Sequence, residues 1–564
     1  MKLMKLVMLL IAYGGISSCG GKSAGGPESI INKIGAHTSQ ILIKRNKPLT
    51  VDLEATVDTD EENFEYIWDL GDGSILEGKK ITHKYTVPGC YEISLSTKNE
   101  TSHHDRVETT IRVISDPPQN TKEWEITGIP TDNDLIPRDT ETNFGYINLE
   151  LDYFNPKFET LVVRTFINNQ LAEEYNTELC GEPPSLRVPI KAERKARNLE
   201  FSLRGLEEEL IIGEAKNIVA GDVYLVNGQS NAVSIEYSGS ARENIDNFVR
   251  SYGSRSEDVL THSLDSLWHT AVVGEPMGGK GAIGQWPLRM ALQLSSKFNI
   301  PIGIINSGHG ARQIGYFQRN NLNHLDLTTN YGRALDRVTR AKALAQIRAV
   351  LFYQGEADRG NTAEHLSGIV KLIENWEQDY SVAEKIYITQ IRSGCGGYHA
   401  GQLEIRDGQR RLPNKSPNIS IMSTTGLDGH SGCHFSYAYG YRELGDRYAN
   451  LIARDIYSET GQTDVEAINV LSATLESNTI IIKTSSDATN ILIDEDIEDS
   501  FELRGGSRSI TAVRNSGNDI LVDLSPGENP QMIGYKGHPG PGPWITNSKG
   551  IGLLAFLLPI IDIE

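Results

Sequence analysis

Residues 221–232 read GDVYLVNGQSNA, and this stretch decides the fold of the largest part of the chain. The apolar run Val223–Val226 is typical of a buried β-strand, and it stops at Gly228, which allows a tight turn. Ser230 then follows directly, where a substrate can reach its hydroxyl and its own N–H can face an oxyanion. Taken alone, the motif is more typical of an ordinary Ser/Asn turn.

Further apolar runs follow this strand, and segments with helical spacing separate them. The expected strands are Ile302–Ile305, Ala349–Tyr353, Ile386–Thr389 and Ile419–Met422. Helical spacing follows Pro287 and recurs over residues 366–376. Alternating strands and helices predict a parallel sheet covered on both faces, with its site at the carboxyl ends of the strands.

Polar or glycine residues stand at four of these strand ends. They are Ser230; Gly308-His309-Gly310; Gln354-Gly355-Glu356; and the late loop that contains His434. Together they offer a nucleophile, backbone donors, an amide with an acid, and an imidazole base. Acyl transfer needs this set of groups, so the sequence predicts a serine esterase site.

Four motifs carry a resemblance to a known family. They are Gly228-Gln229-Ser230-Asn231, Ile305-Asn306-Ser307-Gly308 with Gly310, Gln354-Gly355-Glu356, and Cys433-His434-Phe435-Ser436. Residues 219–460 thereby resemble the sialate O-acetylesterase (SASA) domain of the SGNH/GDSL hydrolase superfamily. The resemblance implies a three-layer, flavodoxin-like α/β domain that hydrolyses acetyl esters on sialic acids or polysaccharides without a cofactor.

The resemblance also implies roles for individual residues. Ser230 would be the nucleophile and His434 the general base. The N–H groups of Ser230 and Gly310, with the Gln354 side chain, would form the oxyanion hole. The expected substrate-pocket residues are Gln229, Asn231, His309 and Arg312.

The chain departs from the superfamily pattern at two places. The superfamily usually has an acid three residues before the histidine, and Ser431 stands there. Glu356 or Asp428 is expected to orient His434 instead, with Glu356 favoured; a dyad without an acid is the third possibility. The second strand end usually has a tryptophan and paired glycines, where this chain has His309-Gly310-Ala311.

The flanking segments predict a multidomain envelope protein. Residues 1–19 read as a lipoprotein signal peptide that ends in a lipobox, with Cys19 as the lipidated residue. Residues 31–115 resemble a PKD domain, an Ig-like β-sandwich, because YIWDLGDG at 66–73 is followed by GCYEI at 89–93. Residues 121–218 and 465–564 show strand-like alternation and predict two further β modules. Attachment to a membrane by lipid alone is therefore expected.

Composition agrees with this organisation. The 564 residues are enough for three to five domains, and 54 Lys and Arg against 74 Asp and Glu give a net charge of −20. That balance argues against nucleic-acid binding. No apolar stretch reaches 18 residues, which argues against a multi-span membrane protein. No His/Cys cluster has metal-ligand spacing, so no metal is predicted.

Two alternatives to the carbohydrate esterase remain open, and so does one cysteine pairing. The missing acid at position 431 also suits a non-catalytic carbohydrate-binding surface lipoprotein. The same chemistry would equally serve an esterase acting on peptidoglycan or lipid esters. Cys395 and Cys433 are either free thiols or a disulfide that steadies the His434 loop. The oligomeric state is not predicted.

Overall fold

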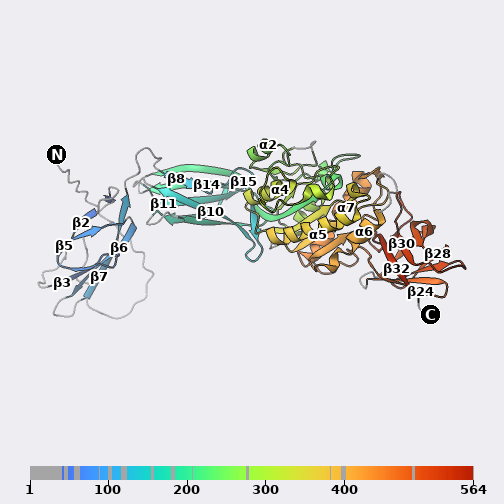
Figure 1. Ribbon diagram of the computed structural model, residues 1–564. Helices are drawn as coiled ribbons and strands as arrows, with labels where there is room; N and C mark the ends of the chain where they lie inside the picture. The colour runs from blue at the N-terminus through green and yellow to red at the C-terminus, as the bar shows by residue number, and fades with distance from the viewer. Residues whose placement is uncertain are drawn as a thin grey trace, which may run out of the picture. The chain divides into compact units, whose positions relative to one another are not determined.

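The apolar run at 223–226 forms the carboxyl end of β15 (Glu209–Gly228) in a computed structural model of the chain (Figure 1). Every residue from 218 to 229 is buried, as expected for a strand covered on both faces. The structure describes residues 41–43, 49–55, 64–87, 89–98, 104–115, 124–153, 158–179, 185–205, 208–274, 279–380, 383–395, 402–485 and 490–562.

Around β15 lies a sheet that is parallel except at one edge. Its other strands are β16 (Val249–Tyr252), β17 (Trp268–Thr270), β18 (Ile302–Asn306), β19 (Ile347–Tyr353), β20 (Lys385–Thr389) and β21 (Ile419–Met422). The spatial order is β17-β16-β18-β15-β19-β20-β21, with only β17 antiparallel. The five strands from β18 to β21 have the flavodoxin-like order 2-1-3-4-5, and β16 and β17 extend one edge. The predicted fold class is therefore confirmed.

Helices cover both faces of this sheet. They are α3 (Gln285–Phe298), α4 (Asn330–Arg340), α5 (Thr362–Asp379), α6 (Gln402–Arg410) and α7 (Arg442–Asp455). Phe352 of β19 contacts Trp376 of α5, with ring centroids 5.1 Å apart. Tyr387 of β20 pairs with Leu351 and therefore points to the opposite face, where it contacts Tyr448 of α7 at 6.0 Å. Consecutive positions along β19 therefore face opposite sides of the sheet, and each side is covered by its own layer of helices.

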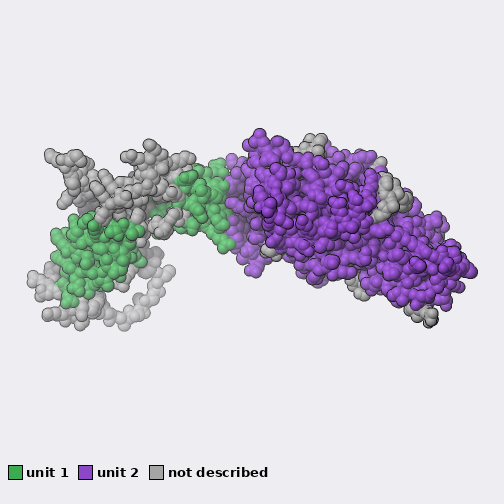
Figure 2. Space-filling model, viewed as in Figure 1, with its two compact units in different colours: residues 1–129, 147–188, 198–215 green, residues 130–146, 189–197, 216–564 purple. Residues whose placement is uncertain are grey.

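The described chain forms two compact units, which Figure 2 shows in different colours. One consists of residues 1–129, 147–188 and 198–215, and the other of residues 130–146, 189–197 and 216–564. The α/β sheet belongs to the second unit. The predicted signal peptide and Cys19 lie outside the described residues.

The first unit contains the predicted Ig-like domain. Its strands are β1 (Ile41–Ile43), β2 (Leu49–Glu54), β3 (Glu65–Asp69), β4 (Ile75–Glu77), β5 (Lys80–Tyr85), β6 (Gly89–Lys98) and β7 (His104–Ser115). They form the sheet β1-β7-β6-β3-β4 and the pair β2-β5. Trp68 is buried in the core, as predicted, and its indole N–H donates to the Gly78 carbonyl oxygen at 2.9 Å. The turn after it needs glycine, because Gly71 and Gly73 have φ of +74° and +84°.

The described residues between 124 and 205 form only strands and their connections, as predicted. Their strands are β8 (Trp124–Thr127), β9 (Leu135–Asp139), β10 (Phe144–Tyr153), β11 (Phe158–Ile167), β12 (Gln170–Glu178), β13 (Ser185–Lys191) and β14 (Arg197–Gly205). The domain boundary predicted between residues 218 and 219 falls inside β15, which continues unbroken from Glu209 to Gly228. The residues on both sides of this boundary favour a β-strand, so local strand propensity does not mark the domain boundary.

The C-terminal β module belongs to the second unit. Its strands are β24 (Val470–Glu476), β25 (Thr479–Thr484), β26 (Leu492–Ile493), β27 (Phe501–Arg504), β28 (Ile510–Ser516), β29 (Asp519–Leu524), β30 (Met532–Tyr535), β31 (Ile545–Thr546) and β32 (Phe556–Asp562). Seven of them form one sheet around buried residues such as Ile482, Val522 and Phe556. None of the helices in the described part of the chain combines the length and apolar character that a membrane span requires.

Candidate active site

Ser230 begins the short helix α1 (Ser230–Val233) directly after β15. The turn before it requires Gly228, because its φ is +128° and a Cβ there would lie 2.2 Å from the Tyr353 carbonyl oxygen. The Gln229 N–H donates to that same oxygen at 2.8 Å. The ends of β15 and β19 are therefore fastened together at the point where the serine emerges.

A pocket of about 940 Å³ lies at the carboxyl edge of the sheet. It is lined by Gln229, Ser230, Gly310, Ala311, Arg312, Gln313, Gly315, Tyr316, Glu356, Ala357, Arg359, Glu364, Cys395, Cys433 and His434. These residues come from loops after β15, β18, β19, β20 and β21. The structure thus brings four predicted residues, Ser230, Gly310, Glu356 and His434, around one cavity, as expected where the strand order reverses.

Two backbone N–H groups are available where an oxyanion would form. A Cβ built on Gly310 would meet the Ser230 Cβ at 3.9 Å, so the glycine faces the serine closely. Within the described chain, neither the Ser230 N–H nor the Gly310 N–H has a hydrogen-bond acceptor. Ser230 is also the first residue of a helix, where N–H groups lack internal partners. This geometry suits the two predicted backbone donors.

The Gln354 carboxamide does not line the pocket, contrary to the arrangement that its predicted role requires. Gln354 is fully buried, and its Nε2 donates to Asp358 Oδ2 at 2.6 Å and to the Arg312 carbonyl oxygen at 3.2 Å. Asp358 Oδ2 also lies 2.9 Å from His365 Nδ1. The amide nitrogen of Gln354 thus already donates to a carboxylate and to a backbone oxygen. These contacts indicate that Gln354 supports the floor of the pocket.

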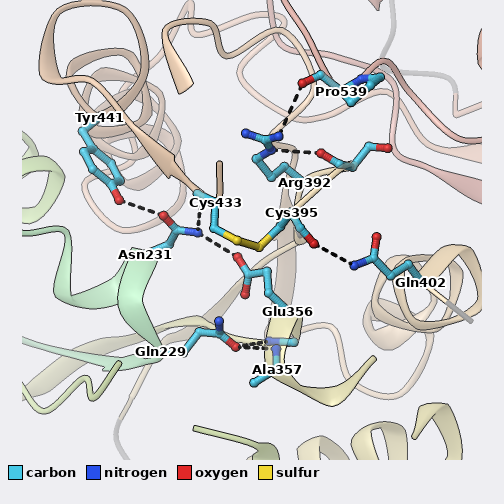
Figure 3. Close-up of a disulfide and its surroundings, with 12 residues drawn as sticks. Gln229, Asn231, Glu356, Ala357, Arg392, Cys395, Gln402, Cys433, Tyr441 and Pro539 are labelled. Atoms are coloured by element: carbon cyan, nitrogen blue, oxygen red, sulfur yellow. Dashed lines mark hydrogen bonds between the residues drawn. A yellow bond between two sulfur atoms is a disulfide. The ribbon is translucent and has the colours of Figure 1, made fainter. Parts of the chain in front are cut away.

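Glu356 is held by Asn231, as Figure 3 shows. Asn231 Nδ2 donates to Glu356 Oε1 at 2.8 Å and to the Cys433 carbonyl oxygen at 3.1 Å, while Asn231 Oδ1 accepts from the Tyr441 hydroxyl at 2.7 Å. Asn231 is fully buried, so it is not the pocket-lining residue that was predicted. Instead it joins the acid to the residue that precedes His434.

Burial raises the pKa of Glu356 to about 7, although the hydrogen bond from Asn231 lowers it in part. Its second oxygen, Oε2, is buried and has no side-chain donor among the residues that the structure describes. A carboxyl group that titrates near neutral pH beside a nucleophile is typical of catalytic sites.

His434 stands in the hairpin of β22 (His430–Ser431) and β23 (His434–Phe435). Burial lowers the pKa of its imidazole, and the charge of Arg392 lowers it further, so the ring stays neutral at pH 7. Among the described residues, no carboxylate lies within 4.0 Å of either ring nitrogen of His434. The identity of the orienting acid stays a prediction.

Asp428, the second candidate acid, is exposed. Its Oδ1 accepts from the N–H of Gly429 at 2.5 Å, within its own loop. Glu356, in contrast, lines the same pocket as His434. The geometry therefore favours Glu356.

A disulfide joins Cys395 and Cys433, with the Cα atoms 4.4 Å apart (Figure 3). This confirms the bridged alternative of the sequence analysis. The Gln402 side chain also donates to the Cys395 carbonyl oxygen at 3.4 Å. Because Cys433 precedes His434, the disulfide ties the loop of the imidazole to the loop after β20.

The loop after β18 places Arg312 and Tyr316 in the lining of the pocket. Arg312 lies 4.7 Å above the ring of Tyr316, whose hydroxyl donates to Glu257. That hydrogen bond lowers the pKa of Glu257, and burial with the same bond raises the pKa of Tyr316 to about 12. Predicted residues Gln229 and Arg312 line the pocket, whereas His309 lies behind it, with Nε2 3.0 Å from Glu257 Oε2.

Sequence reasoning missed several lining residues. They are Gln313, Tyr316, Arg359 and Glu364. They stand in irregular or helical segments after the strand ends, and no motif marks them. They lie about six to eleven positions beyond the strand ends, too far for the strand end itself to mark them.

Two family models match the chain. Residues 220–454 match the family described as carbohydrate esterase, sialic acid-specific acetylesterase, and residues 34–114 match the PKD domain. A search of curated proteins found no relative.

A solved structure shares the fold over most of the chain. The chain is similar to a carbohydrate acetylesterase from Xanthomonas citri, with 14% identity, 77% of this chain and 99% of that one covered, and a TM-score of 0.55. It is also similar to a protein from Arabidopsis thaliana, with 19% identity, 41% and 97% covered, and a TM-score of 0.32. A third is the PKD1 domain of Vibrio anguillarum Epp, with 20% identity, 14% and 88% covered, and a TM-score of 0.12.

Proposed function

Because residues 220–454 are a domain of the sialic acid-specific acetylesterase family of carbohydrate esterases, we propose that the chain removes O-acetyl groups from sialic acids or polysaccharides through an acyl-serine intermediate. The observation that carries the proposal is the convergence of Ser230, Gly310, Glu356 and His434 on one pocket.

Acylation begins when neutral His434 takes the Ser230 hydroxyl proton and the serine oxygen attacks the acetyl carbonyl carbon. Negative charge then develops on the carbonyl oxygen, and the N–H groups of Ser230 and Gly310 stabilise it. The tetrahedral intermediate collapses, and the imidazolium of His434 returns its proton to the departing sugar oxygen.

Deacylation repeats these steps with water as the nucleophile. His434 takes a proton from the water, acetate leaves, and Ser230 regains its proton. In both halves the imidazolium is a cation in a half-buried site, so a nearby carboxylate lowers the free energy of the transition state. Glu356 is assigned this role, with Asn231 fixing its position.

Acetate release from a panel of acetylated sialosides, xylans and pectins tests the substrate class. The proposal predicts release from at least one of them. Hydrolysis of lipid esters alone would overturn the carbohydrate assignment, and hydrolysis of acetylated peptidoglycan alone would exclude the sialosides, xylans and pectins; both outcomes would leave the acyl-serine route intact.

We also propose that the chain is anchored to the cell envelope through a lipid on Cys19. The charged start, the short apolar run and the small residues before this cysteine support the proposal. Metabolic labelling with a fatty-acid probe should mark the wild-type protein, and Cys19→Ser should abolish the label.

Asn231→Ala is expected to lower kcat about 10²-fold, because the acid and the His434 loop lose their shared donor. Since the Asn231 hydrogen bond lowers the pKa of Glu356, its loss should also move the acidic limb of kcat/KM upward from pH 7. Tyr441→Phe leaves the Asn231 amide nitrogen in place on Glu356, so the acidic limb of the pH profile should not move. An unchanged limb in a folded Asn231→Ala protein would contradict the assignment.

Breaking the disulfide is expected to lower kcat roughly tenfold, because the loop that carries His434 loses its tie to Cys395. The bridge closes a 38-residue separation, for which chain entropy allows up to about 4 kcal/mol of stability. The activity of a Cys395→Ser/Cys433→Ser protein should match that of reduced wild type and should not respond to reductant. Equal activity of the reduced and oxidised wild type would refute the positioning role.

A further inference from the structure

Tyr237 lies beside His434, the proposed general base, which lines the pocket. Its ring centroid is 5.6 Å from that of His434, and the two planes are tilted by 46°. The residue stands seven positions after Ser230, in the loop that follows α1, and it is 53% exposed. A half-exposed aromatic ring therefore stands next to the proposed catalytic imidazole.

The Tyr237 loop is held on the segment that carries His434. The Tyr437 N–H donates to the Ser238 carbonyl oxygen at 2.8 Å, and Asn244 Nδ2 donates to the Tyr437 hydroxyl at 2.5 Å. Tyr437 follows His434 by three residues. The chain that follows Tyr237 is therefore held by two hydrogen bonds to Tyr437, close to His434.

The chemistry determines which part of a substrate comes to this place. The acetyl oxygen faces the N–H groups of Ser230 and Gly310, whereas the leaving oxygen must reach His434, which returns the proton to it. The alcohol that leaves thus extends toward His434 and Tyr237. A pyranose ring presents C–H groups on its faces, and a tyrosine offers an apolar ring face with a polar tip.

The rest of the lining also suits a polyhydroxylated alcohol. Gln313, Arg359 and Glu364 provide planar hydrogen-bonding groups across the pocket. A leaving alcohol with a purely apolar chain would offer no hydrogen bonds to these groups.

We propose that Tyr237 is a specificity-determining residue on which the sugar ring that bears the acetyl ester stacks. The inference rests on the proposed function and extends it, because it assigns the leaving-group subsite to a pyranose ring. It predicts that Tyr237 acts on sugar esters and not on esters of small alcohols.

The test compares acetate release from peracetylated xylobiose and from triacetin. Tyr237→Ala should lower kcat/KM for the sugar about tenfold, chiefly through KM, and change kcat/KM for triacetin less than twofold. Tyr237→Phe should restore the sugar activity. Tyr439→Ala, at a 68% exposed tyrosine of the neighbouring segment, is the matched control and should change neither.

Equal losses on both esters would overturn the inference, since they would show that Tyr237 only supports His434. No loss on either ester would overturn it as well. A wild-type protein that releases acetate from neither ester and from none of the acetylated sialosides, xylans and pectins would refute the proposed function itself, which distinguishes the two failures.

Discussion

Ser230→Ala is expected to lower kcat by at least ~10⁴, because the acyl-serine route has no other nucleophile and the remaining groups only bind and polarise the ester. KM should change little, since the pocket keeps its shape and its two backbone donors. Acetate release from an aryl acetate measures the loss, and a serine-reactive phosphonate should label wild type at Ser230 and leave the variant unlabelled.

Ser367→Ala is a suitable control for this change. Ser367 is on α5, away from the pocket lining, and its hydroxyl donates to the Glu364 carbonyl oxygen of its own helix at 3.1 Å. This variant should retain wild-type activity and labelling. Retained activity in Ser230→Ala would refute the mechanism, and a wild-type protein that takes up no phosphonate would favour the carbohydrate-binding alternative.

The parallel sheet was predictable because its strands are buried on both faces. Such strands appear as short continuous apolar runs, and the runs at 302–305, 349–353 and 386–389 all lie within observed strands. Once the sheet is parallel, every polar strand end lies at one edge. This topological constraint brought Ser230, Gly310 and Glu356 to one pocket without any knowledge of side-chain geometry.

The roles of the amide side chains were not predictable in the same way. Asn231 and Gln354 both follow strands and both carry a carboxamide, yet Asn231 bonds to Glu356, 125 residues later, and Gln354 bonds to Asp358. Such hydrogen-bond partners depend on how neighbouring loops fold over one another. The spacing of residues in the sequence does not encode that arrangement. For the same reason, the hydrogen bond from Tyr316 to Glu257 could not be predicted from the sequence.

We propose that the acid missing from position 431 is replaced by a residue from another strand end. Position 431 carries a serine, and Asp428, in the same loop, is exposed. Glu356 reaches the pocket from the end of β19 and is linked through Asn231 to the residue before His434. A buried carboxylate is the stronger partner for an imidazolium, since water screens an exposed one.

Glu356→Gln should accordingly lower kcat by ~10⁴, by comparison with an Asp-to-Asn change in a serine triad, while Asp428→Asn stays within twofold of wild type. The pH profile separates the role of the charge from that of the shape. Burial raises the pKa of Glu356 to about 7, so the carboxylate forms only as pH rises through 7, and wild-type kcat/KM should rise with it. In Glu356→Gln this limb should disappear, and the residual activity should follow His434, whose pKa is lowered below its ordinary value.

Stability supplies the control for this substitution. A carboxyl group whose folded pKa is raised stabilises the protein in its protonated form, and that contribution is lost as pH rises through about 7. The neutral amide of Glu356→Gln never bears the charge, so its Tm at pH 8 should be no lower than that of wild type. A folded variant with near wild-type kcat, together with a collapse in Asp428→Asn, would assign the orienting acid to Asp428 and require its loop to close over His434 during catalysis.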